Sequence, residues 1–243
     1  MHIYDTLIIG SGYSSLGYAL KNENSIICEE NQICDTHFYL PLKTFSYKEY
    51  TPKTEYAKKL LGIFNSLSVI NGDMLNTNAL ECGICKFITE TKVKILLKCR
   101  VIKAEKENGI FKATIQTNQG LSFIYAKKVL NTLSSDTDPF FTTLFITDNI
   151  EKDKAALLNE FKDGNICPAF YRNRYALQIN AKGFDENTVK TFIYEKWKKL
   201  KLNAKILYMA PVFYYNNATD GLSDRNYQNP IEAFEAGYFY KEG

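Results

Sequence analysis

The stretch that decides the fold is YDTLIIGSGYSSLGYALKNENSIICEE, residues 4–30. It opens with a short apolar run that ends at Gly10, a pattern typical of a buried parallel strand. The following residues contain two glycines and then Leu16, Ala19 and Leu20 at helical spacing, so we expect a short helix to begin inside the glycine turn. Residues 25–30 form a second apolar run that ends in acid, which predicts a second parallel strand.

The glycine turn matches the pattern G-x-G-x-x-G, with Gly10, Gly12 and Ser15 at the three glycine positions. Strand, glycine turn, helix and strand in this order form a Rossmann-type βαβ unit. Gly10 permits a tight turn, and Gly12 lets the backbone approach a pyrophosphate that the helix N-terminus favours. We therefore predict that the ADP half of a dinucleotide is held by Gly10, Ser11, Gly12, Tyr13, Ser14 and Ser15.

A carboxylate at the tip of the second strand can accept hydrogen bonds from ribose hydroxyls and would repel a 2′-phosphate, which disfavours NADP. Glu29 and Glu30 both stand at this position. We favour Glu29, because it directly follows the apolar run.

The rest of the chain is divided by its periodicity. After the second strand we expect an excursion over residues 35–75 that contains one helix at 56–67, and then a helix at 77–89. Asn-Gly and Gln-Gly breaks predict a β-meander; its strands cover residues 92–108, 109–118 and 120–133. Beyond residue 136 we expect strands at 167–183 and 204–215 and a helix at 185–201. The last thirty residues are polar and turn-rich up to the segment IEAFEAGYFYKEG, residues 231–243.

Composition narrows the class of partner. The net charge of +3 in 243 residues is too small to argue for nucleic acid, and no apolar run is long enough for a membrane helix. The first residues lack a signal-peptide pattern, so we expect a cytoplasmic protein with reduced thiols and a small-molecule substrate. The six cysteines show no second ligand pair at zinc spacing, and no metal is expected.

Three segments resemble FAD-dependent oxidoreductases, particularly the branch of glycine oxidase and D-amino-acid oxidase. Residues 4–30 resemble the FAD fingerprint of that family, and residues 94–120 resemble the strand and hairpin that contact the adenine near Val101. Residues 126–136, AKKVLNTLSSD, are similar to the family segment that returns to the nucleotide. The resemblance implies that FAD is the cofactor and that Val101, Thr132 and Ser134 contribute to its site.

The fold class that follows is α/β: a Rossmann-type FAD/NAD(P)-binding parallel sheet with a β-meander insertion and a smaller α+β second region. Residues 1–136, with the excursion 35–75, form the FAD-binding domain. Residues 137–243 form a smaller substrate, cap or partner-binding region.

Two departures from the family pattern leave more than one function open. Ser134 stands where the family has glycine, and we find no C-terminal glycine-aspartate segment of the kind that contacts the flavin ribityl chain. Either the flavin end is built differently, a partner chain completes it, or cofactor binding is lost. The first function is an FAD-dependent oxidoreductase that acts on a small amine-like or other small molecule by hydride transfer to flavin. The second is a non-catalytic or partner-dependent nucleotide-binding subunit, and an NAD-binding reductase is a third, less favoured interpretation.

Other candidate residues have a functional and an ordinary interpretation. Cys82 and Cys85 form a C-x-x-C that could be a redox dithiol or two small residues on a helix. Arg172 and Arg174 alternate onto one face of a predicted strand. They could clamp a substrate carboxylate, or they could lie on a solvated strand edge. His37 follows the second strand and could reach a flavin, but a surface histidine is the favoured interpretation.

Overall fold

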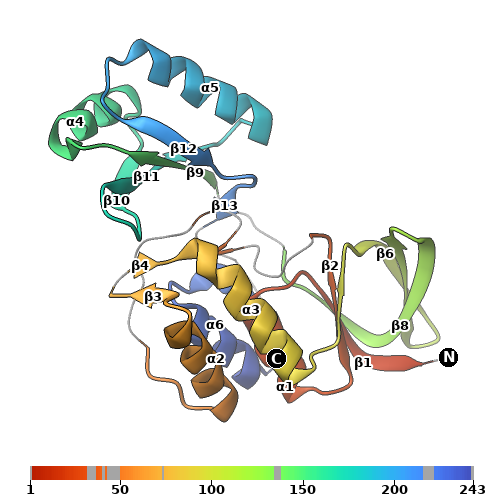
Figure 1. Cartoon of the computed structure of the whole chain (residues 1–243). Coiled ribbons are helices and arrows are strands. Elements are labelled where there is room, and N and C mark those ends of the chain that lie inside the picture. Colours follow the sequence, from red (N-terminus) through yellow and green to blue (C-terminus); the bar gives the residue numbers. More distant parts are fainter. Residues whose placement is uncertain are drawn as a thin grey trace.

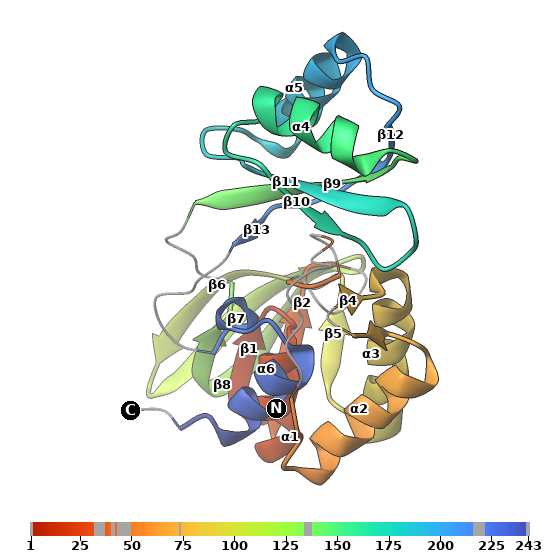
Figure 2. The same ribbon diagram turned by 90° about the vertical axis from the view of Figure 1, so that its left-hand side faces the viewer.

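The computed structural model of this chain describes residues 2–31, 37–39, 42, 50–72, 74–133, 138–215 and 222–241. These residues form two units, one below and one above in Figures 1 and 2. The first unit contains a six-stranded sheet, whose strands lie in the order β5 (Ile95–Leu97), β2 (Ser25–Glu29), β1 (Ile3–Ile9), β8 (Gly120–Asn131), β7 (Ile110–Thr117) and β6 (Arg100–Glu107). The second contains a sheet in the order β10 (Asn165–Pro168), β11 (Arg174–Asn180), β9 (Pro139–Ile146) and β12 (Lys205–Met209), with β13 (Tyr214–Tyr215) paired to β9.

The parallel half of the first sheet carries the glycine turn. β1 (Ile3–Ile9) pairs in parallel with β2 (Ser25–Glu29) and with β8 (Gly120–Asn131), and β2 pairs in parallel with β5 (Ile95–Leu97). α1 (Tyr13–Lys21) connects β1 to β2. The predicted βαβ unit and the α/β fold class are therefore confirmed.

The other half of the sheet is the predicted meander. β6 (Arg100–Glu107), β7 (Ile110–Thr117) and β8 pair antiparallel. The prediction of one strand over 92–108 was wrong, because Lys98 adopts a left-handed φ of 52° and separates β5 from β6. A residue in that conformation cannot continue an extended strand.

Alternating residues of β1 face two different cores. Ile8 packs with the helices of the first unit, whereas Leu7 packs with Ile26 and with buried meander residues such as Ala113 and Ile124. Side chains of a strand alternate between the two faces of a sheet. The parallel strands are consequently covered on both faces, as their continuous apolar sequences require.

The predicted excursion and the helix that follows it contribute a helical layer. α2 (Glu55–Ser66) and α3 (Thr77–Thr91) match the predicted helices, and a small hairpin of β3 (Ile70–Asn71) and β4 (Met74–Leu75) lies between them in sequence. Phe64 and Phe87 from these helices are fully buried in the same core as Leu16 of α1.

The C-terminal segment returns to the first unit. η1 (Asp224–Asn226) is followed by α6 (Pro230–Phe239), a helix that the apolar periodicity did not predict. A Cβ on Gly17 of α1 would stand 2.0 Å from the carbonyl oxygen of Phe234 in α6. The two helices thus touch backbone to backbone, and the C-terminal part of region 137–243 packs on the first unit (Figure 2).

The second unit is an antiparallel sheet covered by helices on one face. Its strands are β9 (Pro139–Ile146), β10 (Asn165–Pro168), β11 (Arg174–Asn180), β12 (Lys205–Met209) and β13 (Tyr214–Tyr215). α4 (Ile150–Glu160) and α5 (Glu186–Lys199) lie on the face away from the first unit (Figures 1 and 2). Phe145, Leu177 and Ile193 are fully buried between sheet and helices.

Among the described residues, no helix combines the length and the apolar character that crossing a membrane would need.

Candidate functional site

The glycine turn is held against the end of β8. Gly10 has a left-handed φ of 92°, and a Cβ on it would stand 2.5 Å from Cδ2 of Leu133. Only glycine combines this φ with so close an approach. The Thr132 hydroxyl donates to the Ile9 carbonyl oxygen at 2.9 Å and fixes the two strand ends together.

The N-terminus of α1 binds an anion supplied by the chain itself. The amide nitrogens of Tyr13 and Ser14 donate to the carboxylate of Asp224 at 2.6 and 2.7 Å, and the Ser14 hydroxyl donates to it at 2.6 Å. A Cβ on Gly12 would lie 2.4 Å from Asp224 Oδ2, so this approach needs glycine. Asp224 stands where exposed amides at a helix N-terminus hold a phosphate, and its carboxylate shows that the loop fits an anion.

Glu29 lies beside this loop and is 2% exposed. One carboxylate oxygen accepts from the Ser11 amide at 2.8 Å and the Ser11 hydroxyl at 2.7 Å. The other accepts from the amide and the side-chain nitrogen of Asn31, each at 2.8 Å. A carboxylate accepts about four hydrogen bonds, so Ser11 and Asn31 together occupy the acceptor positions of Glu29.

Glu30 is placed differently from its neighbour. Its side chain is exposed and lies 3.7 Å from the guanidinium of Arg100. The structure thus puts Glu29, and not Glu30, in contact with the glycine turn.

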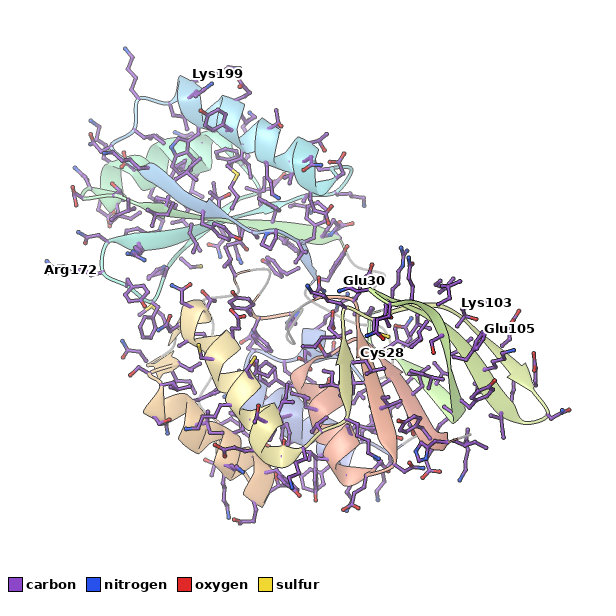
Figure 3. All side chains as sticks on the ribbon, turned by 45° about the vertical axis from the view of Figure 1, so that its right-hand side comes forward. Cys28, Glu30, Lys103, Glu105, Arg172 and Lys199 are labelled. Atoms are coloured by element: carbon purple, nitrogen blue, oxygen red, sulfur yellow. The ribbon has the colours of Figure 1, made fainter. Side chains whose placement is uncertain are left out.

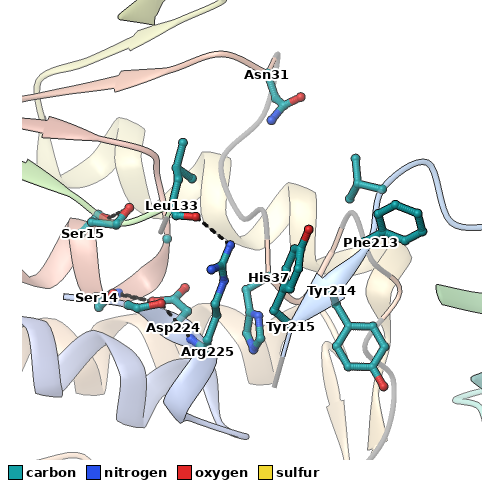
Figure 4. A pocket seen from close by; sticks show the side chains of 14 residues that line it. Ser14, Ser15, Asn31, His37, Leu133, Phe213, Tyr214, Tyr215, Asp224 and Arg225 are labelled. Atoms are coloured by element: carbon teal, nitrogen blue, oxygen red, sulfur yellow. Dashed lines mark hydrogen bonds between the residues drawn. The ribbon is translucent and has the colours of Figure 1, made fainter. Parts of the chain in front are cut away.

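A small cavity opens from the loop toward the second unit (Figure 4). Its volume is about 140 Å³. One wall comes from the glycine turn, α1 and the end of β8, and the opposite wall comes from residues 212–215 around β13. Strand ends, a helix N-terminus and a second sheet therefore meet at this cavity.

Arg225 and Tyr215 face each other in the cavity wall. The guanidinium of Arg225 donates to the Leu133 carbonyl oxygen at 3.0 Å and lies 4.6 Å from the centre of the Tyr215 ring, a cation–π distance. Burial lowers the pKa of Arg225 from its ordinary value, although an arginine stays protonated in proteins. The guanidinium therefore gives this wall a permanent positive charge.

His37 also lines the cavity, next to Arg225 in Figure 4. It is 5% exposed and its ring packs edge-on against Phe38 with a centroid distance of 4.8 Å. The interpretation of His37 as a surface histidine was wrong, because its ring is enclosed between Phe38 and the residues of the cavity wall.

A second, open groove of about 440 Å³ continues from the tip of β2. Its walls include Glu30, Lys98, Arg100 and Thr117, and Asn31 lines both this groove and the cavity. Val101, predicted to lie near an adenine, is half-buried on β6 beside it and pairs with Ile115. The two hollows thus share Asn31, which donates two hydrogen bonds to Glu29.

Several predicted residues lie elsewhere. Arg172 is exposed in the turn before β11, at the outer edge of the second unit in Figure 3, and Arg174 begins β11 with its guanidinium 4.7 Å from the Tyr171 ring. The prediction of one strand carrying both arginines was wrong, because Asn173 takes a left-handed φ of 59°. Cys82 and Cys85 are exposed on α3 and line neither hollow. Ser134 lies outside the described residues.

Asp224 is the residue that sequence reasoning missed. Asp224 is preceded by Ser223 and not by glycine, so it does not match a glycine-aspartate pattern. Its carboxylate nevertheless reaches the glycine turn from 210 residues away along the chain.

Comparison with solved structures decides the fold. The p-nitrophenol 4-monooxygenase PnpA from Pseudomonas putida DLL-E4 matches 87% of this chain and 67% of its own, with 13% identity and a TM-score of 0.52. BexE, studied for oxidation during BE-7585A biosynthesis, matches 85% of this chain with 9% identity and a TM-score of 0.56. Aklavinone-11 hydroxylase, solved with FAD and aklavinone, matches 86% with 10% identity and a TM-score of 0.51. The chain has the fold of FAD-binding flavoproteins.

This flavoprotein fold is shared over only part of the larger enzymes, since the chain spans about half the length of BexE and aklavinone-11 hydroxylase, 52% and 53%. No protein-family model matches the chain, and no curated protein does. PnpA is a monooxygenase and aklavinone-11 hydroxylase is a hydroxylase, so the resemblance of this chain to the amino-acid oxidase branch stays a prediction.

Proposed function

We propose that the chain is an FAD-dependent oxidoreductase acting on a small molecule. The observation that supports it most strongly is the convergence of three donors from Tyr13 and Ser14 on one anion, at the N-terminus of the first helix of a flavoprotein fold. Aklavinone-11 hydroxylase, which shares this fold, was solved with FAD.

The residues assigned to the cofactor follow from their positions. The amides of Tyr13 and Ser14, with Gly12 leaving room, would hold the diphosphate. Glu29 would accept from the ribose hydroxyls, and the groove with Lys98 and Arg100 would take the adenosine end. Bound FAD would supply the electron-accepting chemistry, while the protein binds and orients.

The substrate is assigned to the cavity between the two units. Tyr214, Tyr215 and Phe213 give it an aromatic wall, and Arg225 gives it a positive charge. His37 adds a buried imidazole to the wall of the cavity. A small amine-like or other small substrate that gives a hydride to flavin fits the resemblance to amino-acid oxidases, whereas the named neighbours favour an aromatic compound.

A second function, a non-catalytic or partner-dependent nucleotide-binding subunit, is favoured by the size of the cavity. At about 140 Å³ it is smaller than the ~300–1,000 Å³ typical of drug-sized ligand sites. Both carboxylate oxygens of Glu29 are already engaged by the chain. A subunit of this kind would bind ADP and gain no flavin colour.

One experiment separates the two functions. The purified chain is examined for flavin absorbance and its melting temperature is measured with FAD, ADP, NAD and NADP, because a ligand that binds the native state raises it. Yellow protein and a larger shift with FAD than with ADP support the oxidoreductase. Equal shifts with ADP and FAD in colourless protein support the subunit, and no shift with any of the four overturns both.

A further inference from the structure

We propose that Asp224 closes the anion site of α1 from within, so that a dinucleotide is admitted only when the 222–226 segment withdraws. This inference rests on the proposed function, because it concerns regulation of the same site. Its basis is the contact of the Asp224 carboxylate with the amides of Tyr13 and Ser14 at 2.6 and 2.7 Å.

The N-terminus of α1 is not capped by the residue before it, so its acceptor comes from a distant part of the chain. α2, α5 and α6 are each capped by the side chain of the residue directly before them, namely Thr54, Asp185 and Asn229. α1 has Gly12 at that position, which has no side chain to give. Asp224 supplies the missing acceptor, and it is 5% exposed.

A carboxylate and a diphosphate cannot share these donors. The backbone of Gly12 lies so close to Asp224 that even a Cβ would collide with its carboxylate, and no phosphate oxygen could enter between them. Two anions held side by side in a buried place also repel each other strongly. Cofactor entry therefore requires the carboxylate to leave, and the chain loses three charge-assisted hydrogen bonds when it does.

Arg225 ties this internal anion to the second unit. It is the next residue in the chain, and its guanidinium is held by the Leu133 carbonyl oxygen and by the ring of Tyr215 on β13. Figure 4 shows the side chain of Arg225 between those of Asp224 and Tyr215 along the cavity wall. A displacement of β13 would therefore also displace the 222–226 segment. The position of the second unit would in this way determine whether Asp224 occupies the anion site.

The test is a calorimetric titration of ADP, which carries the diphosphate without the flavin, into the wild type and Asp224→Ala. We expect ADP to bind Asp224→Ala about tenfold or more tightly, equivalent to about 1.4 kcal/mol. Asp185→Ala is the matched control, because it removes the carboxylate that accepts from the first amides of α5 instead, and it should leave ADP affinity unchanged. Circular dichroism checks that each variant is folded, and Asp224→Asn replaces the alanine variant if that does not fold.

Amide hydrogen exchange gives a readout that does not depend on ligand affinity. Without ligand, exchange at Tyr13 and Ser14 should be faster in Asp224→Ala than in the wild type, and ADP should slow it again. Equal exchange in the two proteins without ligand overturns the closure. Unchanged or weaker ADP binding by Asp224→Ala also overturns it but leaves the proposed function standing, whereas a wild type that binds neither ADP nor FAD overturns both.

Discussion

Gly237 of α6 lies directly on Ser14 of α1: a Cβ on Gly237 would stand 1.9 Å from the Ser14 carbonyl oxygen. A Cβ on Gly17 of α1 would likewise stand 2.0 Å from the Phe234 carbonyl oxygen of α6. The helix that presents the anion site is thus positioned by a helix from the other end of the sequence. Loss of either glycine should affect stability and the site together.

We expect Gly237→Ala and Gly17→Ala each to lower the free energy of unfolding by about 1–3 kcal/mol, because overpacking displaces neighbouring backbone. Urea denaturation of each variant and of the wild type measures this change in the free energy of unfolding. Gly62→Ala is the control, since a Cβ on Gly62 of α2 would meet no atom within 4 Å, and it should gain up to about 1 kcal/mol. Equal effects at Gly62 and Gly237 would contradict the close helix packing.

A buried carboxylate of α6 should make stability depend on pH. Burial alone would raise the pKa of Glu235, but donation from the Thr54 amide, the Tyr50 hydroxyl and the Lys53 amide lowers it below its ordinary value of 4.5. A depressed pKa contributes stability that is present above the unfolded value and lost as the pH falls through the folded value.

Thermal melts of the wild type and Glu235→Gln from pH 7 to pH 3 measure this contribution. The wild type should melt higher at pH 7, and the difference should shrink below about pH 4.5. Glu195→Gln, an exposed change on α5, should show no such pH dependence. A difference between wild type and Glu235→Gln that stays constant down to pH 3 would refute the assignment.

Glu29 and Glu30 are adjacent in sequence, but we expect their substitution to affect FAD binding differently. Glu29→Gln should weaken FAD binding about tenfold, because it removes the charged acceptor beside the glycine turn. Glu30→Gln should change FAD affinity little, since its side chain is exposed. Titration followed by flavin fluorescence compares them, and a larger loss at Glu30 would show that the ribose is assigned to the wrong residue.

The parts of the site that local sequence encodes could be predicted. The apolar run before Gly10 and the acid after Cys28 lie within one βαβ unit, so strand, turn and helix follow from neighbours in the chain. The helix 185–201 was predicted because its N-cap, Asp185, and its apolar stripe are also local. The structure agrees with both.

The remaining features depend on distant contacts. α6 was not predicted because most of its residues are buried, including Ile231, Phe234 and Gly237. A helix with almost no polar face shows no clear alternation of apolar and polar residues at helical spacing. Its start was nevertheless signalled by Asn229 and Pro230, an N-cap followed by proline at the first helical position. Asp224 gave no signal of its own, since only the folded chain brings it to α1.

Main-chain amides at the start of α1 are assigned to the diphosphate of FAD, and titration calorimetry of FAD into the wild type and Gly12→Val tests this central claim most directly. Gly62→Ala serves as a glycine control away from the site. We predict that the wild type and Gly62→Ala bind FAD with equal affinity and that Gly12→Val, folded by circular dichroism, loses at least about tenfold. A wild type that takes up no FAD, or a Gly12→Val that binds it as tightly, would contradict the claim.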